Sequence, residues 1–187
     1  MPTTTNYGFY SPPLTGVTPN VPRDTKTLAD AVDVALKAEE TARIAADAKI
    51  GTPSVDVIAN AVQSLANATE VTITYNTAIS NPDGMWSSGG NITIPTGGGG
   101  LYAINLGFSY AGNATGARIV LIKVNGTTVR SWTVTTGSAA AFTGMLPYWR
   151  RLSAADVVTM ALYQSSGGSL NTFNQSYPSI QMYRAGI

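Results

Sequence analysis

The sequence contains no cysteine and no histidine. These two absences exclude disulfide bonds, thiol chemistry, zinc sites of the usual ligand type and any Ser-His-Asp catalytic arrangement. Because most common catalytic designs are removed in this way, the sequence predicts a protein that is not an enzyme and that holds no cofactor.

Charged residues are also scarce. Asp, Glu, Lys and Arg make up 11% of the chain, whereas about a quarter is usual in globular domains. The formal net charge is +1, so electrostatics favour neither nucleic acid nor an anionic membrane as a partner, and no apolar run is long enough to span a bilayer. We expect no nucleic acid partner and no membrane insertion. Surface that is buried between subunits needs few charges, so the composition favours an oligomer.

The residues that are present indicate an antiparallel β-domain, and the stretch 92–110 is its clearest part. A short strand before Pro95 is followed by a glycine-rich break at 97–100 and then by a longer alternating strand. Alternation places five large apolar side chains on one face of this strand: Tyr102, Ile104, Leu106, Phe108 and Tyr110. We expect a second sheet to cover that face.

Period-two patterns continue through the rest of residues 70–187. Further strands are expected at 71–76, 118–124, 128–134, 138–149, 157–164 and 179–184. Asn125-Gly126 is a tight hairpin signal. The predicted fold is mainly β: an antiparallel jelly-roll sandwich at 70–187, preceded by an α-helical stalk and an extended N-terminal arm.

The N-terminal arm is expected at residues 1–24. Five prolines disfavour a helix there, and the segment is too short to form a core. Disordered tails are usually poor in aromatic residues, whereas this segment carries Tyr7, Phe9 and Tyr10. We therefore favour an arm whose aromatic side chains become ordered on a partner, with a disordered tail as the alternative.

The helical stalk is expected at residues 25–69, with a break at 51–54. Its first helix is capped by Asp24 or Thr25. This helix has a small-residue seam in heptad register through Leu28, Ala31, Ala35, Ala38, Ala42 and Ala45, and a competing stripe through Val32, Leu36 and Ile50. The sequence fits both registers.

A second helix is predicted after Pro53. Four apolar residues recur there at intervals of three, four and three and would form a trimer seam: Val55, Ile58, Val62 and Leu65. A helical hairpin that packs on its own chain is the alternative. The first helix lacks the broad apolar stripe that such a hairpin would bury, so a three-stranded stalk is favoured.

Two features of the β-region have residue types that could support chemistry or binding. Asp83 and Asp156 are its isolated carboxylates beyond Glu70, and we expect turn residues rather than a catalytic pair or a calcium site. An aromatic and basic cluster, Tyr148, Trp149, Arg150 and Arg151, is a candidate surface-binding site. The alternative is that its aromatic residues lie at a subunit contact.

The β-region resembles a known family. Gly-Leu-Tyr at 100–102, Phe108, Val-Asn-Gly at 124–126, the turn at 152–158 and Leu-Tyr-Gln at 162–164 are similar, in order and spacing, to the trimeric jelly roll of complement globular heads and the tumour necrosis factor superfamily. That family usually has glycine where this chain has Ala155. The resemblance implies a homotrimer.

The first 35 residues resemble a different group of proteins. Tyr7-Gly8, the proline-spaced run to Pro22 and the segment 28–33 look like the amino-terminal part of structural proteins of tailed bacteriophages, often tail fibres or head appendages. This resemblance implies a location on the outer surface of the virion, with capsid, neck or tail proteins as partners of the arm. The two resemblances together imply a knob for attachment to host glycan or protein. The alternative is a head decoration or neck protein that binds no receptor.

Overall fold

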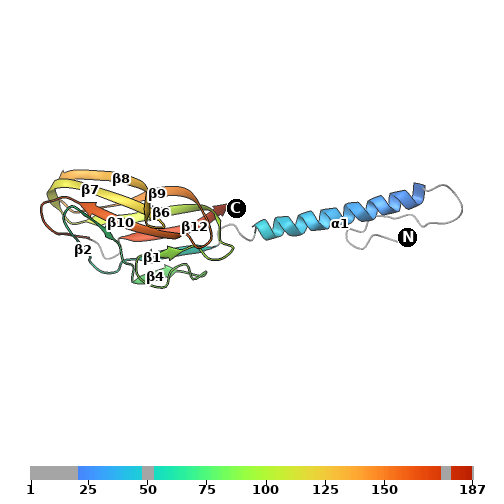
Figure 1. Cartoon of the computed structure of the whole chain (residues 1–187), viewed down its shortest axis with the longest axis horizontal. Helices are drawn as coiled ribbons and strands as arrows, with labels where there is room; N and C mark the ends of the chain where they lie inside the picture. The colour runs from blue at the N-terminus through green and yellow to red at the C-terminus, as the bar shows by residue number, and fades with distance from the viewer. Residues whose placement is uncertain (1–20, 48–52, 174–177, 187) are drawn as a thin grey trace. The chain divides into compact units, whose positions relative to one another are not determined.

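A computed structural model describes residues 21–47, 53–173 and 178–186. The chain divides into two compact units, Met1–Ala48 and Lys49–Ile187, and each is described by itself. The first unit contributes one described helix. The described residues of the second unit form twelve strands, and this unit is called the head (Figure 1).

Helix α1 runs over Val21–Asp47. Pro22 is tolerated in its first turn because the N–H groups there have no intrahelical acceptor. Ion pairs one turn apart line the helix, including Lys26 with Asp30 at 2.5 Å and Arg43 with Asp47 at 3.7 Å. The predicted helix is confirmed over residues 25–47, although it begins three to four residues before the expected cap. The described part of this helix is not apolar enough over a sufficient length to cross a membrane.

The head is a sandwich of two antiparallel sheets with a small two-stranded ribbon. Its strands are β1 Ser54–Ile58, β2 Ser64–Leu65, β3 Thr69–Thr72, β4 Thr77–Ser80, β5 Ile92–Thr93, β6 Gly100–Tyr110, β7 Asn113–Val124, β8 Thr127–Ser138, β9 Phe142–Leu152, β10 Val157–Gln164, β11 Leu170–Asn171 and β12 Ser179–Gly186. One sheet has the order β4-β1-β12-β6-β9. The other has the order β3-β10-β7-β8, with β5 also paired to β10, and β11 pairs with β2.

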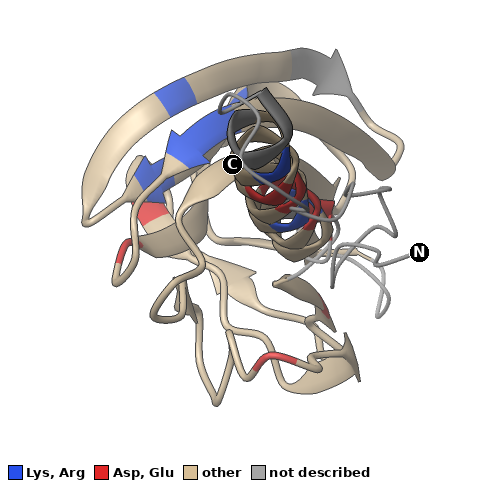
Figure 2. Ribbon diagram, turned by 90° about the vertical axis from the view of Figure 1, so that its right-hand side faces the viewer, with Lys and Arg blue, Asp and Glu red and all other residues tan. Residues whose placement is uncertain are grey.

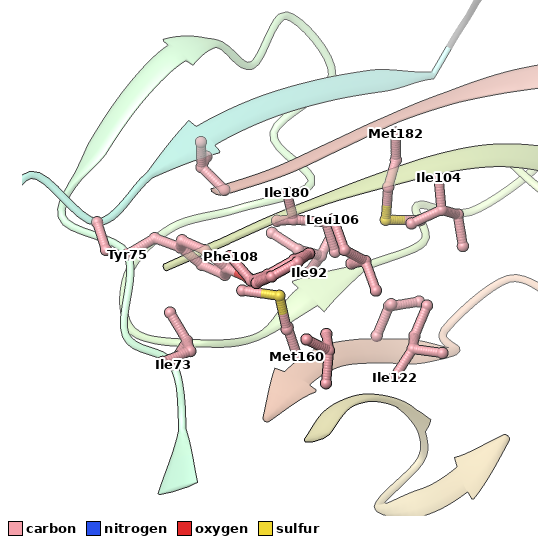
Figure 3. Packing of buried hydrophobic residues seen from close by; sticks show 14 of the residues in the cluster. Ile73, Tyr75, Ile92, Ile104, Leu106, Phe108, Ile122, Met160, Ile180 and Met182 are labelled. Carbon is pink, nitrogen blue, oxygen red and sulfur yellow. The ribbon is translucent and has the colours of Figure 1, made fainter. Parts of the chain in front are cut away.

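The core lies between the two sheets, and β6 contributes the side chains that the sequence predicted. Tyr102, Ile104, Leu106, Phe108 and Tyr110 are all buried. Figure 3 shows three of them packing with side chains of the facing sheet and of the neighbouring strand, among them Ile122, Met160 and Ile180. The mainly β, jelly-roll prediction is therefore confirmed for the head.

The predicted second helix is wrong. Residues 54–58 form β1, which pairs with β12 on one side and with β4 on the other. Val55 and Val57 are buried while their neighbours are partly exposed, which is the period of a strand and not of a helix. The segment carries both periods in its sequence, and β-branched valines together with two available strand partners favour the extended form.

The four residues of the predicted seam consequently lie in different environments within the head. Val55 and Leu65 are buried in its core, Ile58 is half-buried in β1, and Val62 is 51% exposed in the segment that leads to β2. They form no coiled-coil seam. The head also begins near residue 53 rather than at residue 70, and the predicted break at 51–54 lies partly outside the described residues.

Candidate interaction surface

The outward face of the sheet β4-β1-β12-β6-β9 exposes large apolar side chains. Trp149 and Met145 on β9 are 56% and 53% exposed, and Tyr183 on β12 is 41% exposed. Alternation along β9 explains the first two, because every second residue from Thr143 to Arg151 points outward and is exposed. We call this face the outer face.

Small residues of β6 lie between these larger side chains. Ala103 pairs with Trp149 on one side and with Tyr183 on the other, and Gly107 pairs with Met145. The outward-facing residues of β6 are buried or half-buried because larger side chains on the adjacent strands flank them. On the outer face, the small residues of β6 thus lie between larger apolar side chains of β9 and β12. This arrangement allows close approach of another protein surface.

A polar row crosses the same face between the apolar positions. Asn105 donates to the Gln181 side chain at 3.4 Å, and Gln181 donates to the Asp56 carboxylate at 3.2 Å. The row follows the strand register, since Gln181 pairs with both Asn105 and Asp56. These side chains satisfy part of one another's hydrogen-bonding capacity, which lowers the cost of covering them.

The predicted cluster of four residues does not form one site. It lies on consecutive positions of β9, so Trp149 and Arg151 point to the outer face while Tyr148 and Arg150 point the other way. Tyr148 packs edge-on against Trp132 of β8, with ring centroids 5.8 Å apart, and its hydroxyl accepts a hydrogen bond from Arg150 at 3.3 Å. The prediction of one binding surface made of all four side chains is therefore wrong. Trp149 and Arg151 are the two members of the cluster that are exposed to a partner.

The two isolated carboxylates lie at turns and accept backbone hydrogen bonds, as the sequence predicted. The Asp83 carboxylate accepts from the Ser54 N–H at 3.0 Å. The Asp156 carboxylate accepts from the Ser153 N–H and from the Asn125 side chain, both at 2.8 Å. Among the residues that the structure describes, no three His, Cys, Asp or Glu side chains come together as a metal site would require.

Burial perturbs several titratable groups inside the head. Desolvation raises the pKa of Tyr102 to about 12, with Arg184 opposing the shift. Burial also raises the pKa of Tyr75 and of Tyr110, and it lowers that of the Arg118 guanidinium. Arg118 donates to three backbone carbonyls and lies 6.0 Å from the Tyr110 ring centroid. These groups lie within the fold and not on the outer face, so their shifts reflect burial.

Other predicted site residues cannot be placed. Tyr7, Phe9 and Tyr10 of the proposed anchoring arm lie outside the described residues. Sequence reasoning also missed Met145 and Tyr183. The alternation of β9 could have indicated Met145, but the alignment of Tyr183 with Trp149 depends on the order of β12, β6 and β9, which no local pattern encodes.

By its sheets and their strand order, the head is a jelly roll of the type found in complement globular heads and tumour necrosis factor proteins. It is similar to the globular domain of zebrafish complement 1qA protein, with 13% identity, a TM-score of 0.50, and coverage of 71% of this chain and 97% of that one. It is also similar to murine APRIL crystallised at pH 5.0, with 10% identity, a TM-score of 0.52, and coverage of 70% and 97%. No protein-family model and no curated protein matches the sequence. At these identities the likeness shows the fold alone.

Proposed function

We propose that this chain is a homotrimeric structural protein of a bacteriophage particle, whose jelly-roll head is displayed on the virion surface for attachment to the host. In this proposal the heads associate through the outer face, helix α1 contributes to a stalk, and residues 1–24 dock on capsid, neck or tail proteins. The protein acts as a binding module and carries out no reaction.

One observation carries the assembly part of the proposal: Trp149, Met145 and Tyr183 are exposed around the small residues of β6. Aromatic residues and methionine are enriched where proteins meet, and contiguous exposed apolar surface is unusual on a monomer. Covering a half-exposed tryptophan removes apolar area from water at about 25 cal/mol per Å². Three-fold symmetry is inferred from the resemblance to trimeric heads of the same fold.

Helix α1 supports a stalk through its exposed apolar residues. Leu28 is 64% exposed and Leu36 is 42% exposed, and alanines continue the seam from Leu28 in heptad register. Alanine buries little area, so this helix would associate weakly by itself and would depend on the heads to hold three copies together.

The particle-bound part of the proposal is supported by the resemblance of the first 35 residues to phage structural proteins. Many tethered copies convert weak individual contacts into strong attachment, because each further contact forms at a high effective concentration. A head with modest affinity would suffice on a particle.

The mass of the full chain in solution tests the assembly. We expect three times the 19.5 kDa of one chain at micromolar concentration, and a shift towards monomer for Trp149→Ala. Phe173→Ala is the matched control, since Phe173 is 57% exposed at another position on the head. A monomeric wild-type protein would remove the trimer from the proposal.

Adsorption tests the attachment role. The full-length protein should bind host cells and compete with the phage particle for them. A trimer that neither binds nor competes would instead favour the decoration or neck role, in which the head stabilises the particle without a receptor.

A further inference from the structure

The ribbon formed by β2 and β11 presents four exposed side chains on one side. Leu170 pairs with Leu65, and Asn171 pairs with Ser64. Continuing this register places Phe173 opposite Val62, and alternation puts Ser64, Val62, Asn171 and Phe173 on the same side of the ribbon. All four are exposed, while Leu65, Leu170 and Thr172 on the other side are buried. We call these four side chains the end patch.

Hydrogen bonds to other segments of the head fix the backbone that carries the end patch. The Thr172 N–H donates to the Gln63 carbonyl, and the Gln63 N–H donates to the Thr172 hydroxyl, both at 2.9 Å. The Gln63 side chain also exchanges two hydrogen bonds with the backbone of Thr74, at 2.8 and 2.9 Å. The Phe173 N–H donates to the hydroxyl of buried Ser109 at 3.2 Å. The backbone that carries Phe173 is therefore tied to three other segments of the head.

A second glutamine fixes the neighbouring loop. The fully buried Gln164 side chain donates to the carbonyls of Leu65 and Gly168, at 3.0 and 2.8 Å, and accepts from Ser166 at 2.7 Å. The backbone of the end patch is thus already ordered in the folded protein, which lowers the entropic cost of binding a ligand.

The segments that surround the end patch are uncharged: residues 59–68, 74–76, 111–117 and 165–173 contain no Asp, Glu, Lys or Arg. The charged residues next to them in sequence are already engaged. Arg118 is 2% exposed and donates to three backbone carbonyls within 113–117, and Glu70 pairs with Lys123. Charged residues are sparse on the head as a whole and frequent on α1 (Figure 2). The end of the head that contains residue 53 does carry charged residues, among them Asp83, Asp156 and Arg184.

We infer that the end patch binds an uncharged saccharide. Phe173 and Val62 supply an apolar platform for the C–H face of a sugar ring, and the Asn171 amide and Ser64 hydroxyl beside it can donate to and accept from sugar hydroxyls. A phosphorylated, sulfated or sialylated ligand would find no cation in these segments. This inference rests on the proposed attachment role and names its site and its ligand class.

The test uses the full-length protein on an array of immobilised neutral and anionic oligosaccharides. We expect binding to neutral members, a loss of about tenfold or more for Phe173→Ala, and little change between about 0.05 and about 0.5 M salt because no charge pair is screened. Ile79→Ala is the control, since Ile79 is 62% exposed on β4, and all variants should keep the wild-type mass and unfolding midpoint.

Several outcomes would overturn the inference: no binding to any neutral oligosaccharide, binding confined to anionic ones, or neutral binding that Phe173→Ala leaves unchanged. Host-cell adsorption that survives periodate oxidation of the cell-surface glycans would point to a protein partner and would also contradict it. Measuring mass on the same samples separates the two proposals, because a trimer without saccharide binding refutes the end patch, whereas a monomer that binds saccharide refutes the assembly.

Discussion

Ala155 occupies a backbone conformation that suits glycine. Its φ is 68°, in the left-handed region where a Cβ costs about 1 kcal/mol or more. The surrounding turn holds it there, since the Ala155 N–H donates to the Ile94 carbonyl at 2.9 Å and the Asp156 carboxylate binds the Ser153 N–H. The family that the sequence resembles usually has glycine at this position, and the positive φ gives the physical reason.

Ala155→Gly should therefore stabilise the protein by about 0.5 to 1 kcal/mol, because relief of backbone strain exceeds the added freedom of the unfolded chain. Urea unfolding would measure the change in midpoint. Ala154→Gly is the control: Ala154 does not have a positive φ, so the same substitution should destabilise slightly. Equal effects at both positions would contradict the strain argument.

Two buried tyrosines differ in what their hydroxyls contact. The Tyr75 hydroxyl is buried and has no hydrogen-bond partner among the described residues. The Tyr102 hydroxyl donates to the Gly98 carbonyl at 2.6 Å. An unpaired buried hydroxyl costs free energy, whereas a paired one is close to balanced.

Tyr75→Phe should leave the free energy of unfolding unchanged or raise it by up to about 1 kcal/mol. Tyr102→Phe should lower it by about 1 kcal/mol, since the Gly98 carbonyl loses its donor. Thermal unfolding of both variants under one condition gives the comparison, and a larger loss for Tyr75→Phe than for Tyr102→Phe would refute it.

At the scale of elements, the contact between β6 and β9 depends on a glycine. Phe108 pairs with Gly144 in the register, and a Cβ on Gly144 would lie 2.4 Å from a ring carbon of Phe108. The Phe108 ring is held by Phe142 and Tyr110, whose centroids lie 6.1 and 6.3 Å away. The ring has little room to move aside.

Gly144→Ala should destabilise the head by about 1 to 3 kcal/mol through overpacking. The comparison is Gly168→Ala, because a Cβ at Gly168 meets no atom within 4 Å. Chemical denaturation of the two variants should separate them clearly. Similar stabilities would mean that the aromatic cluster repacks at little cost.

At the scale of the whole molecule, the boundary of the head has a direct consequence. β1 lies between β4 and β12, and its residues Val55 and Val57 are almost completely buried. A fragment that begins at residue 70 lacks this strand, exposes the edge of β12 and leaves the space of both valines empty.

The fragment 49–187 should therefore unfold cooperatively, whereas the fragment 70–187 should fail to fold or lose most of its stability. Near-ultraviolet circular dichroism and thermal melting distinguish the two. A cooperative transition of equal midpoint in both fragments would show that β1 is dispensable, contrary to its position between β4 and β12.

The extent of sequence-based prediction differs between segments for a physical reason. The inward face of β6 follows from alternation within one strand, and the hairpin at Asn125 and Gly126 follows from local backbone preference, with φ of 51° and 77° in the structure. Segment 54–65 was predicted incorrectly because its apolar spacing fits a helix as well as a strand, and only pairing with β12 and β4 distinguishes them.

The candidate surfaces depend even more on distant contacts. Alternation alone separates Trp149 from Tyr148, but the sequence does not say which of the two faces outward. The end patch depends on Gln63 and Gln164, whose acceptors and donors lie up to about a hundred residues away. Gln63 lies outside the strands and Gln164 is the last residue of β10, and neither position carries a local signal of such a role.

The sequence by itself determined the mainly β class of the head, the helix over α1, the strands with strong alternation and the exclusion of thiol and imidazole chemistry, because each of these depends on residue type or on neighbours within a few positions. The tertiary structure decided that residues 54–58 are a strand and that Trp149, Ala103 and Tyr183 lie side by side. It also decided that Phe173 lies next to the β2–β11 ribbon, with its N–H bonded to Ser109. These facts come from pairing between segments far apart in the chain, and the free energy of such pairing depends on which partners the completed fold brings together.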